Sequence, residues 1–310
     1  MALFVYNKYY DLRWDIHIFP CEKYRLVRAR LLQSGVADVS DFVEAEPADD
    51  ADILLVHTRA YLRRLYDYTR SPMSAIFELE APLFYETLSA FFRMTGGTVK
   101  AARRAILERS FWANIGGGFH HAFPDHGEGF CAINDVAVAI RVLQEEGLIK
   151  RAAVVDCDLH QGNGTAFIFQ HDQSVFTFSI HQENLYPPKQ KSDLDIGLDD
   201  FTGDDVYLEK LRAGLERVFE KGGYDIVFYL AGADPYEGDR LGELRLSKEG
   251  LLERDRMVFE AARRDGAAVC VVLAGGYADR TEDVVEIHTN TLTLMKEMRC
   301  LLYTSPSPRD

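Results

Sequence analysis

The stretch AAVVDCDLHQGNGTAF, residues 152–167, decides how this chain is expected to fold. Its first four residues form a short apolar run, which is typical of a strand buried on both faces of a sheet. Polar side chains follow at once, with Asp156, Asp158 and His160 spaced at i, i+2 and i+4. They fall on one side of the chain if the segment stays extended. This pattern predicts a ligand site at one edge of a sheet.

Similar apolar runs recur along the chain, and each is expected to form a strand: 3–6, 53–56, 112–115, 175–180, 226–230 and 269–273. Helical patterns lie between them, at 134–146 before Gly147, at 204–220 before Gly222, and at about 247–264. Buried strands that alternate with helices predict an α/β fold. We expect a single domain of three layers, with a mostly parallel β-sheet flanked by helices.

Composition limits the class of protein. The chain has 310 residues, of which 47% are hydrophobic, and this is enough for a large core. A formal net charge of −14 argues against direct binding of nucleic acid and favours cationic partners. No apolar run approaches the ~18 to 20 residues that cross a bilayer, and no secretory signal is evident. We therefore expect a protein of the cytoplasm, or of the nucleus in a eukaryote, with its five cysteines reduced.

The last residues, CLLYTSPSPRD (300–310), resemble the in-frame translation of a sequencing adapter, and we exclude them from the predicted domain. The alternative is an ordinary disordered tail. The predicted domain therefore spans residues 1–299.

Candidate functional residues follow several predicted strands. His120 and His121 come after 112–115, Asp234 follows 226–230, and Tyr277 follows 269–273. In an open parallel sheet, ligands bind where the carboxyl ends of the strands meet. Residues far apart in the sequence are therefore expected to converge in one crevice.

A metal ion fits this set of residues. Asp158, His160 and Asp234 would supply two carboxylates and one imidazole and leave a coordination position open, as catalytic zinc sites do. Fe(II) accepts the same ligands. The competing interpretation of Asp-x-Asp-x-His is a capped turn after a strand, with no metal.

Five segments together resemble the zinc-dependent histone deacetylase family, which has the arginase/deacetylase fold: GGGFHHA (116–122), GFCAIND (129–135), DCDLHQGNGTAF (156–167), AGADPYEGDRLG (231–242) and AGGYADR (274–280). LLVHTRAYL (54–62) and residues 95–121 resemble its class IV branch in particular. The likeness runs from about residue 4 to residue 295.

The resemblance implies catalytic roles for four residues besides the three metal ligands. His121 would be the general base, and Asp156 would orient the neighbouring His120. Tyr277 would donate a hydrogen bond to the oxygen of the tetrahedral intermediate. General-base transfer and a placed donor suit amide hydrolysis at zinc.

The resemblance also implies a pocket for an acyl-lysine side chain. Phe130, next to Gly129, would form one aromatic wall, and Tyr186 would form the opposite wall. Gly275 and Gly276 would leave room for Tyr277 and the substrate.

A potassium ion beside the zinc site is likewise implied. Backbone oxygens near Asp156 would hold it, together with Ser179 and Ile180. Asn163 stands where some family members carry an aspartate that pairs with the second histidine, so His121 would be a weaker base here.

The remaining histidines are expected to be structural, with His57 at the start of a helix, and His171 and His288 on the surface. His17 and His126 are candidates for the rim of the pocket.

Three functions remain open. The first is removal of acetyl or longer fatty acyl groups from Nε-acyl-lysine of proteins. The second is the same chemistry on an acetylpolyamine or another small acylated amine. The third is a non-enzymatic module that binds acyl-lysine.

Overall fold

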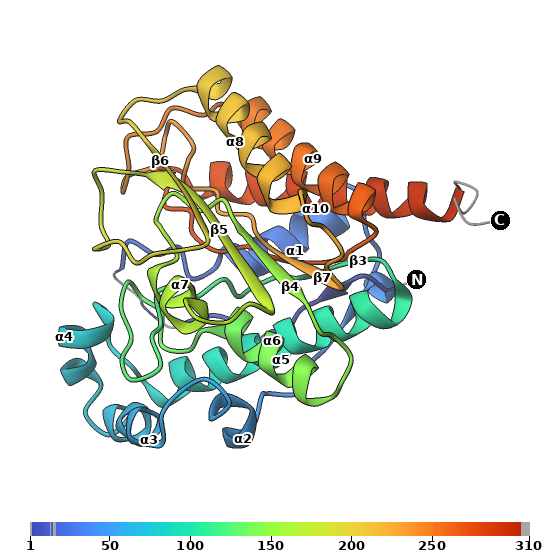
Figure 1. Ribbon diagram of the computed structural model, residues 1–310. Coiled ribbons are helices and arrows are strands. Elements are labelled where there is room, and N and C mark those ends of the chain that lie inside the picture. The colour runs from blue at the N-terminus through green and yellow to red at the C-terminus, as the bar shows by residue number, and fades with distance from the viewer. Residues whose placement is uncertain (1, 13, 15–16, 305–310) are drawn as a thin grey trace.

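A computed structural model describes residues 2–12, 14 and 17–304, so residues 305–310 of the predicted tail (300–310) lie outside the described part (Figure 1). Eight strands form one sheet in the order β2-β1-β3-β8-β7-β4-β5-β6, and all its pairings are parallel. The strands are β1 (Phe4–Val5), β2 (Phe42–Val43), β3 (Phe111–Asn114), β4 (Ala152–Asp156), β5 (Val175–Gln182), β6 (Leu194–Leu198), β7 (Ile226–Leu230) and β8 (Ala268–Val272).

Helices cover both faces of this sheet (Figure 1). On one face lie α5 (Tyr85–Glu108), α6 (Asp135–Glu145) and α7 (Asn163–Phe169), with the short α2 (Asp50–Ile53), α3 (Arg59–Tyr68) and α4 (Ile76–Leu79) beyond them. On the other face lie α1 (Lys23–Gln33), α8 (Asp204–Phe219), α9 (Lys248–Asp265) and α10 (Thr281–Thr304). The predicted three-layer α/β fold is confirmed.

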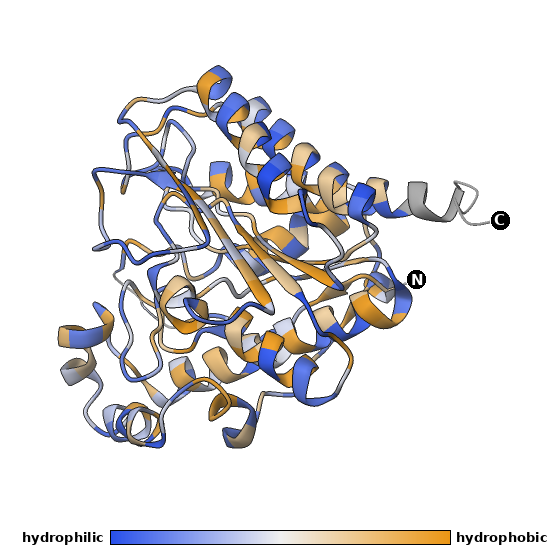
Figure 2. Ribbon diagram, viewed as in Figure 1, coloured by the Kyte–Doolittle hydropathy of each residue, from blue (hydrophilic) through white to orange (hydrophobic). Residues whose placement is uncertain are grey.

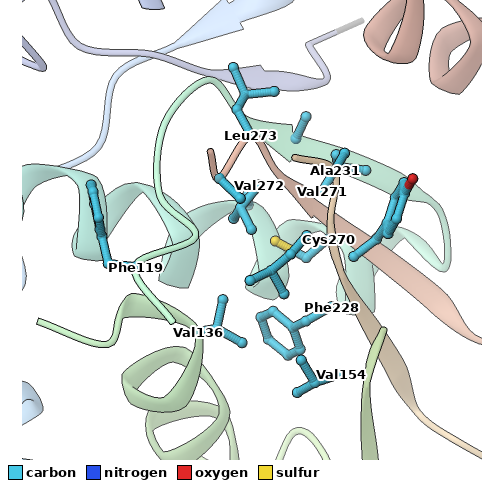
Figure 3. Packing of buried hydrophobic residues seen from close by; sticks show 14 of the residues in the cluster. Phe119, Val136, Val154, Phe228, Ala231, Cys270, Val271, Val272 and Leu273 are labelled. Carbon is cyan, nitrogen blue, oxygen red and sulfur yellow. The ribbon is translucent and has the colours of Figure 1, made fainter. Parts of the chain in front are cut away.

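The core is built from apolar strands and the helix faces that cover them. In Figure 2 the hydrophobic colour concentrates on the central strands and on the sides of the helices that face them. Val154, Phe228 and Cys270 come from three adjacent strands and pack against Val136 of α6 (Figure 3). Burial of this apolar surface is the main term that stabilises such a fold.

Residue types that commonly begin and end helices do so in α6 and α9. Asn134 caps α6 by accepting a hydrogen bond from the Ala137 amide, and Ser247 caps α9 through the Gly250 amide. Gly266 ends α9 in the left-handed region, with φ of 79°.

The predicted strand at 53–56 is wrong. Asp49 and Asp52 form a capping box that begins α2, and a turn follows Ile53. The apolar run therefore ends a short helix rather than forming a strand. None of the helices in the described ranges combines the length and the apolar character that crossing a membrane requires.

Candidate active site

The candidate residues meet at the carboxyl edge of five neighbouring strands. β3, β8, β7, β4 and β5 are consecutive in the sheet. The histidine pair, Tyr277, Asp234, the Asp-x-Asp-x-His run and Ser179 belong to these strands or follow them. The sheet order thus brings together segments that are more than a hundred residues apart in the sequence.

Asp158, His160 and Asp234 form a buried cluster that could hold a metal ion. One potential ligand atom from each residue lies within 4.8 Å of the others. His160 Nδ1 is 3.3 Å from Asp158 Oδ1 and 3.5 Å from Asp234 Oδ2. Asp234 Oδ2 is buried and has no hydrogen-bond partner in the described residues, a costly state for a carboxylate oxygen. A bound cation would remove that cost, so the residues fit a metal site.

Backbone amides hold these carboxylates in place. The His160 amide donates to Asp158 Oδ1 at 3.0 Å, and the Leu159 amide donates to Asp234 Oδ1 at 2.9 Å. The Gly275 amide, from the loop after β8, donates to Asp158 Oδ2 at 2.8 Å. The loops after β4, β7 and β8 therefore fix one another around the cluster.

Gly275 has a more specific role than the sequence indicated. A Cβ atom on this residue would lie 2.0 Å from Asp234 Oδ2 and 2.7 Å from Asp158 Oδ2, so a side chain would displace the candidate ligands themselves. Gly276 has φ of 141°, which disfavours other residues, and a Cβ there would lie 2.9 Å from Val284 Cγ1.

The two adjacent histidines are buried and differently connected. His120 Nδ1 is 2.7 Å from Asp156 Oδ2, and His121 Nδ1 is 2.7 Å from Asn163 Oδ1. The amide nitrogen of Asn163 donates to Glu128, so its oxygen faces His121 and accepts the Nδ1 hydrogen. The Nε2 atom of neutral His121 therefore carries the lone pair.

The same contacts give the histidines opposite affinities for a proton. Burial alone would lower the pKa of His120, but the carboxylates of Asp156 and Asp158 outweigh burial and raise it to about 9. Burial lowers the pKa of His121 well below 6.5, and the neighbouring His120 and His160 add to this effect. The two Nε2 atoms are 3.1 Å apart, so one nitrogen can donate a hydrogen to the other, but there is no room between them for two hydrogens.

Tyr277 lies beside the cluster with its ring centre 6.4 Å from that of His160. Its amide donates to Asp239 Oδ2 at 2.7 Å, which fixes the backbone. Burial, followed by the nearby Asp158 and Asp234, raises the pKa of the phenol well above 10. The hydroxyl group therefore stays protonated and can donate a hydrogen bond.

A small cavity beside the cluster is lined by the predicted residues Gly129, Phe130 and Tyr277 and by His121. Tyr186 borders the same region, because its ring centre is 5.6 Å from that of His121. The structure thus places Phe130 and Tyr186 near His121, and their role as the walls of an acyl-lysine pocket stays a prediction.

His17 and His126 do not line this cavity, although His17 contacts Phe130, which does, so their place at the rim stays a prediction. The His17 ring is 4.6 Å from that of Phe130, and His126 Nε2 is 3.3 Å from Glu128 Oε1. The surface prediction for His288 is wrong: it is fully buried on α10, against Gly276. His57 is buried too, whereas His171 is exposed.

Ser179 and Ile180 lie on β5, where Ser179 pairs with Asp156 of β4. All three are buried, and the Ser179 hydroxyl is 2.9 Å from His181 Nδ1. The potassium site stays a prediction.

Sequence reasoning missed several buried charged residues, and two of them contact the loops after β8 and β3. Lys23 of α1 has no exposed surface, and its Nζ donates to the Ala274 carbonyl at 2.5 Å. Burial lowers its pKa to about 8, against the opposing effect of Asp234 and Asp158. No local pattern in α1 distinguishes this lysine from a surface one.

Asp135 is the second missed residue, although it ends the GFCAIND segment. Its carboxylate accepts hydrogen bonds from the amides of Gly118 and Phe119 and from the Thr98 hydroxyl. The loop that carries His120 is therefore held by a buried carboxylate on α6.

Comparisons with known proteins show the family to which this chain belongs. The family description "Histone deacetylase domain" matches residues 17–292. Histone deacetylase 2 of Arabidopsis thaliana is 31% identical over 91% of this chain and 76% of its own length. An uncharacterised protein of Picosynechococcus is 41% identical over 88% of this chain and 91% of its own length.

Among solved structures, an HDAC homologue complexed with SAHA superposes with a TM-score of 0.82 at 25% identity, and the match covers 96% of this chain and 84% of that one. The chain belongs to the histone deacetylase family of hydrolases, with the arginase/deacetylase fold.

Proposed function

We propose that this chain is a zinc-dependent deacylase that hydrolyses the amide bond of Nε-acyl-lysine. The observation that carries the proposal is the convergence of the Asp158, His160 and Asp234 cluster with the unprotonated Nε2 of His121 and the protonated hydroxyl of Tyr277. Family membership supports an enzyme that acts on amides. Resemblance of the residues upstream of the histidine pair supports placement in class IV.

The buried side chains divide the chemistry among themselves. His121 Nε2 accepts a proton from the attacking water and later returns it to the leaving amine nitrogen. Asn163 accepts the Nδ1 hydrogen, so the Nε2 lone pair is the proton-accepting site of neutral His121. The Tyr277 hydroxyl donates to the carbonyl oxygen as negative charge develops there. A zinc ion held by the cluster would supply the Lewis acidity that polarises the carbonyl and acidifies the water, and Fe(II) would suit the same ligands.

The test combines metal analysis with turnover of acetyl-lysine, myristoyl-lysine and acetylpolyamine substrates in parallel. We expect about one metal ion per chain and release of the acyl group from lysine. Tyr277→Phe should lower kcat by roughly 100-fold or more and leave the metal content unchanged.

Two outcomes would count against this proposal. Faster cleavage of acetylpolyamine than of acyl-lysine would move the function to small amines. A metal-loaded protein that is inert toward the whole panel would identify a binding module instead of an enzyme.

A further inference from the structure

A buried arginine contacts the backbone of two loops that carry candidate metal ligands. Arg254 of α9 has no exposed surface, and its Nη1 donates to the Gly232 carbonyl at 2.6 Å and to the Cys157 carbonyl at 3.3 Å. Cys157 directly precedes the candidate ligand Asp158. Gly232 lies two residues before the candidate ligand Asp234. One guanidinium group therefore joins the loops that follow β4 and β7.

Asp255 fixes the position of this guanidinium group. Its Oδ1 accepts hydrogen bonds from Nε of Arg254 at 2.9 Å and from Nη2 at 2.8 Å. The carboxylate also accepts hydrogen bonds from the hydroxyl groups of Tyr229, on β7, and Thr291, on α10. All four side chains are buried. The ion pair on α9 is therefore anchored to a strand and to a second helix.

The backbone that Arg254 holds lies against both candidate carboxylate ligands. A Cβ atom on Gly232 would be 2.7 Å from Asp158 Oδ2 and 2.7 Å from Asp234 Oδ1. A shift of the Gly232 backbone toward these oxygens would therefore displace the carboxylates. Since Arg254 binds the Gly232 carbonyl, it restrains a segment that contacts both ligands.

Stability alone does not account for this buried pair. Moving two charges out of water costs free energy that their attraction repays only in part, and apolar residues of similar volume often stabilise a core equally well. An apolar side chain, however, has no donor for the two backbone carbonyls, whereas the planar guanidinium group of Arg254 reaches both of them and Asp255. The contacts therefore favour a role in the geometry of the site.

We propose that Arg254 is a positioning residue of the metal site, whose guanidinium group sets the separation of the Asp158 and Asp234 carboxylates. This inference rests on the proposed function, because it requires both carboxylates to bind the metal ion. Arg254 does not line the candidate cavity, so it acts through the two backbone carbonyls and not on the substrate. Loss of these contacts should weaken the metal site and leave substrate binding unchanged.

The test measures Zn²⁺ affinity, by competition with a chelator, for wild type, Arg254→Met/Asp255→Asn and the control Arg299→Met. The double variant removes both charges, so no buried carboxylate is left unpaired, and asparagine keeps an oxygen for the Tyr229 hydroxyl. We expect its Zn²⁺ affinity to fall by about 10- to 100-fold, as it does when groups that orient metal ligands are removed. At saturating Zn²⁺, kcat for acyl-lysine should fall by about tenfold or more, and KM should change by less than about twofold.

Arg299→Met is a matched control because Arg299 is another buried arginine with the same kinds of contact. Its Nη2 is 2.8 Å from Glu108 Oε2, and its Nη1 donates to the Ala2 carbonyl at 2.9 Å. Glu108 and Ala2 precede β3 and β1, so this pair lies at the opposite edge of the parallel sheet from the candidate site. The control should lose stability in urea unfolding and keep the Zn²⁺ affinity and kcat of wild type.

Arg254→Lys is a second test variant, which should fold even if the double variant does not. Lysine keeps the positive charge beside Asp255, but its single nitrogen lacks the planar fork that bonds this carboxylate and both carbonyls together. Its Zn²⁺ affinity should therefore fall by about threefold or more.

Wild-type Zn²⁺ affinity in the folded variants of Arg254 would overturn the inference. An equal loss of affinity in Arg299→Met would overturn it too, because affinity would then follow the overall stability of the protein. The proposed function would survive either result, since wild type would still bind zinc and cleave the acyl-lysine amide. A wild-type protein that neither binds zinc nor cleaves this amide would instead count against the proposed function.

Discussion

The buried His57 provides a prediction that depends on the fold and not on the metal. It is 1% exposed in the turn between α2 and α3. Its Nε2 accepts a hydrogen bond from the Asn134 amide at 3.0 Å, so the hydrogen is on Nδ1, which donates to the Phe123 carbonyl at 2.9 Å. Both ends of the loop that carries Phe130 are therefore held by one neutral imidazole.

Protonation of His57 would break this arrangement. Burial lowers its pKa from 6.5 to about 4 in the folded protein. The unfolded chain therefore binds the proton more readily, and the contribution is complete above pH 6.5 and is lost as the pH falls toward 4. The gap of about 2.5 pH units corresponds to roughly 3 kcal/mol of unfolding free energy, of which about 2 kcal/mol is lost between pH 6.5 and 5.

The assay is urea unfolding of the metal-loaded protein between pH 7.5 and 5, for wild type, His57→Gln and the exposed-site control His171→Gln. As the pH falls over this range, the unfolding free energy of wild type should decrease by about 2 kcal/mol more than that of His57→Gln, because glutamine does not titrate. The control should run parallel to wild type. A wild-type advantage over His57→Gln that stays constant with pH would refute the reasoning.

Two further predictions concern the site. Asp135→Ala should lower the free energy of unfolding, measured with urea, by about 3 to 5 kcal/mol, because the amides of Gly118 and Phe119 lose their buried acceptor. Asp135→Asn keeps an oxygen for these amides and should lower it by only about 1 to 2 kcal/mol. Equal losses for the two variants would contradict this account. Asp234→Asn keeps an oxygen that accepts the Leu159 amide hydrogen bond but removes the negative charge. Metal affinity, measured by competition with a chelator, should therefore fall by more than about 100-fold, which is more than the loss of a residue that only supports a metal ligand would cause. An affinity equal to that of wild type would exclude Asp234 as a ligand.

Much of the fold could be predicted because the central strands are apolar on both faces. Every residue of β4 and β7 is buried, and the apolar residues that make up most of both strands predict this burial from the sequence. β6 was missed because its sequence, LDIGL, is polar at alternate positions, as an edge strand can be. The run at 53–56 was misassigned because two aspartates upstream start a helix there.

The candidate site was predictable where its residues directly follow strands, as Asp158 and Tyr277 do. Lys23 and His288 were not, because both are on helices whose buried faces are known only once the helices pack against the sheet. Local sequence reports where a strand ends, whereas the burial of a charged residue on a helix is a property of the whole fold.

The order of strands has a consequence for synthesis of the chain. β8 is the last strand to leave the ribosome, yet it lies between β3 and β7 in the middle of the sheet. Until residue 272 has emerged, the segment with the histidine pair and the segment with the carboxylates have no strand to join them. A nascent chain can thus have made seven of the eight described strands and still lack the assembled candidate site.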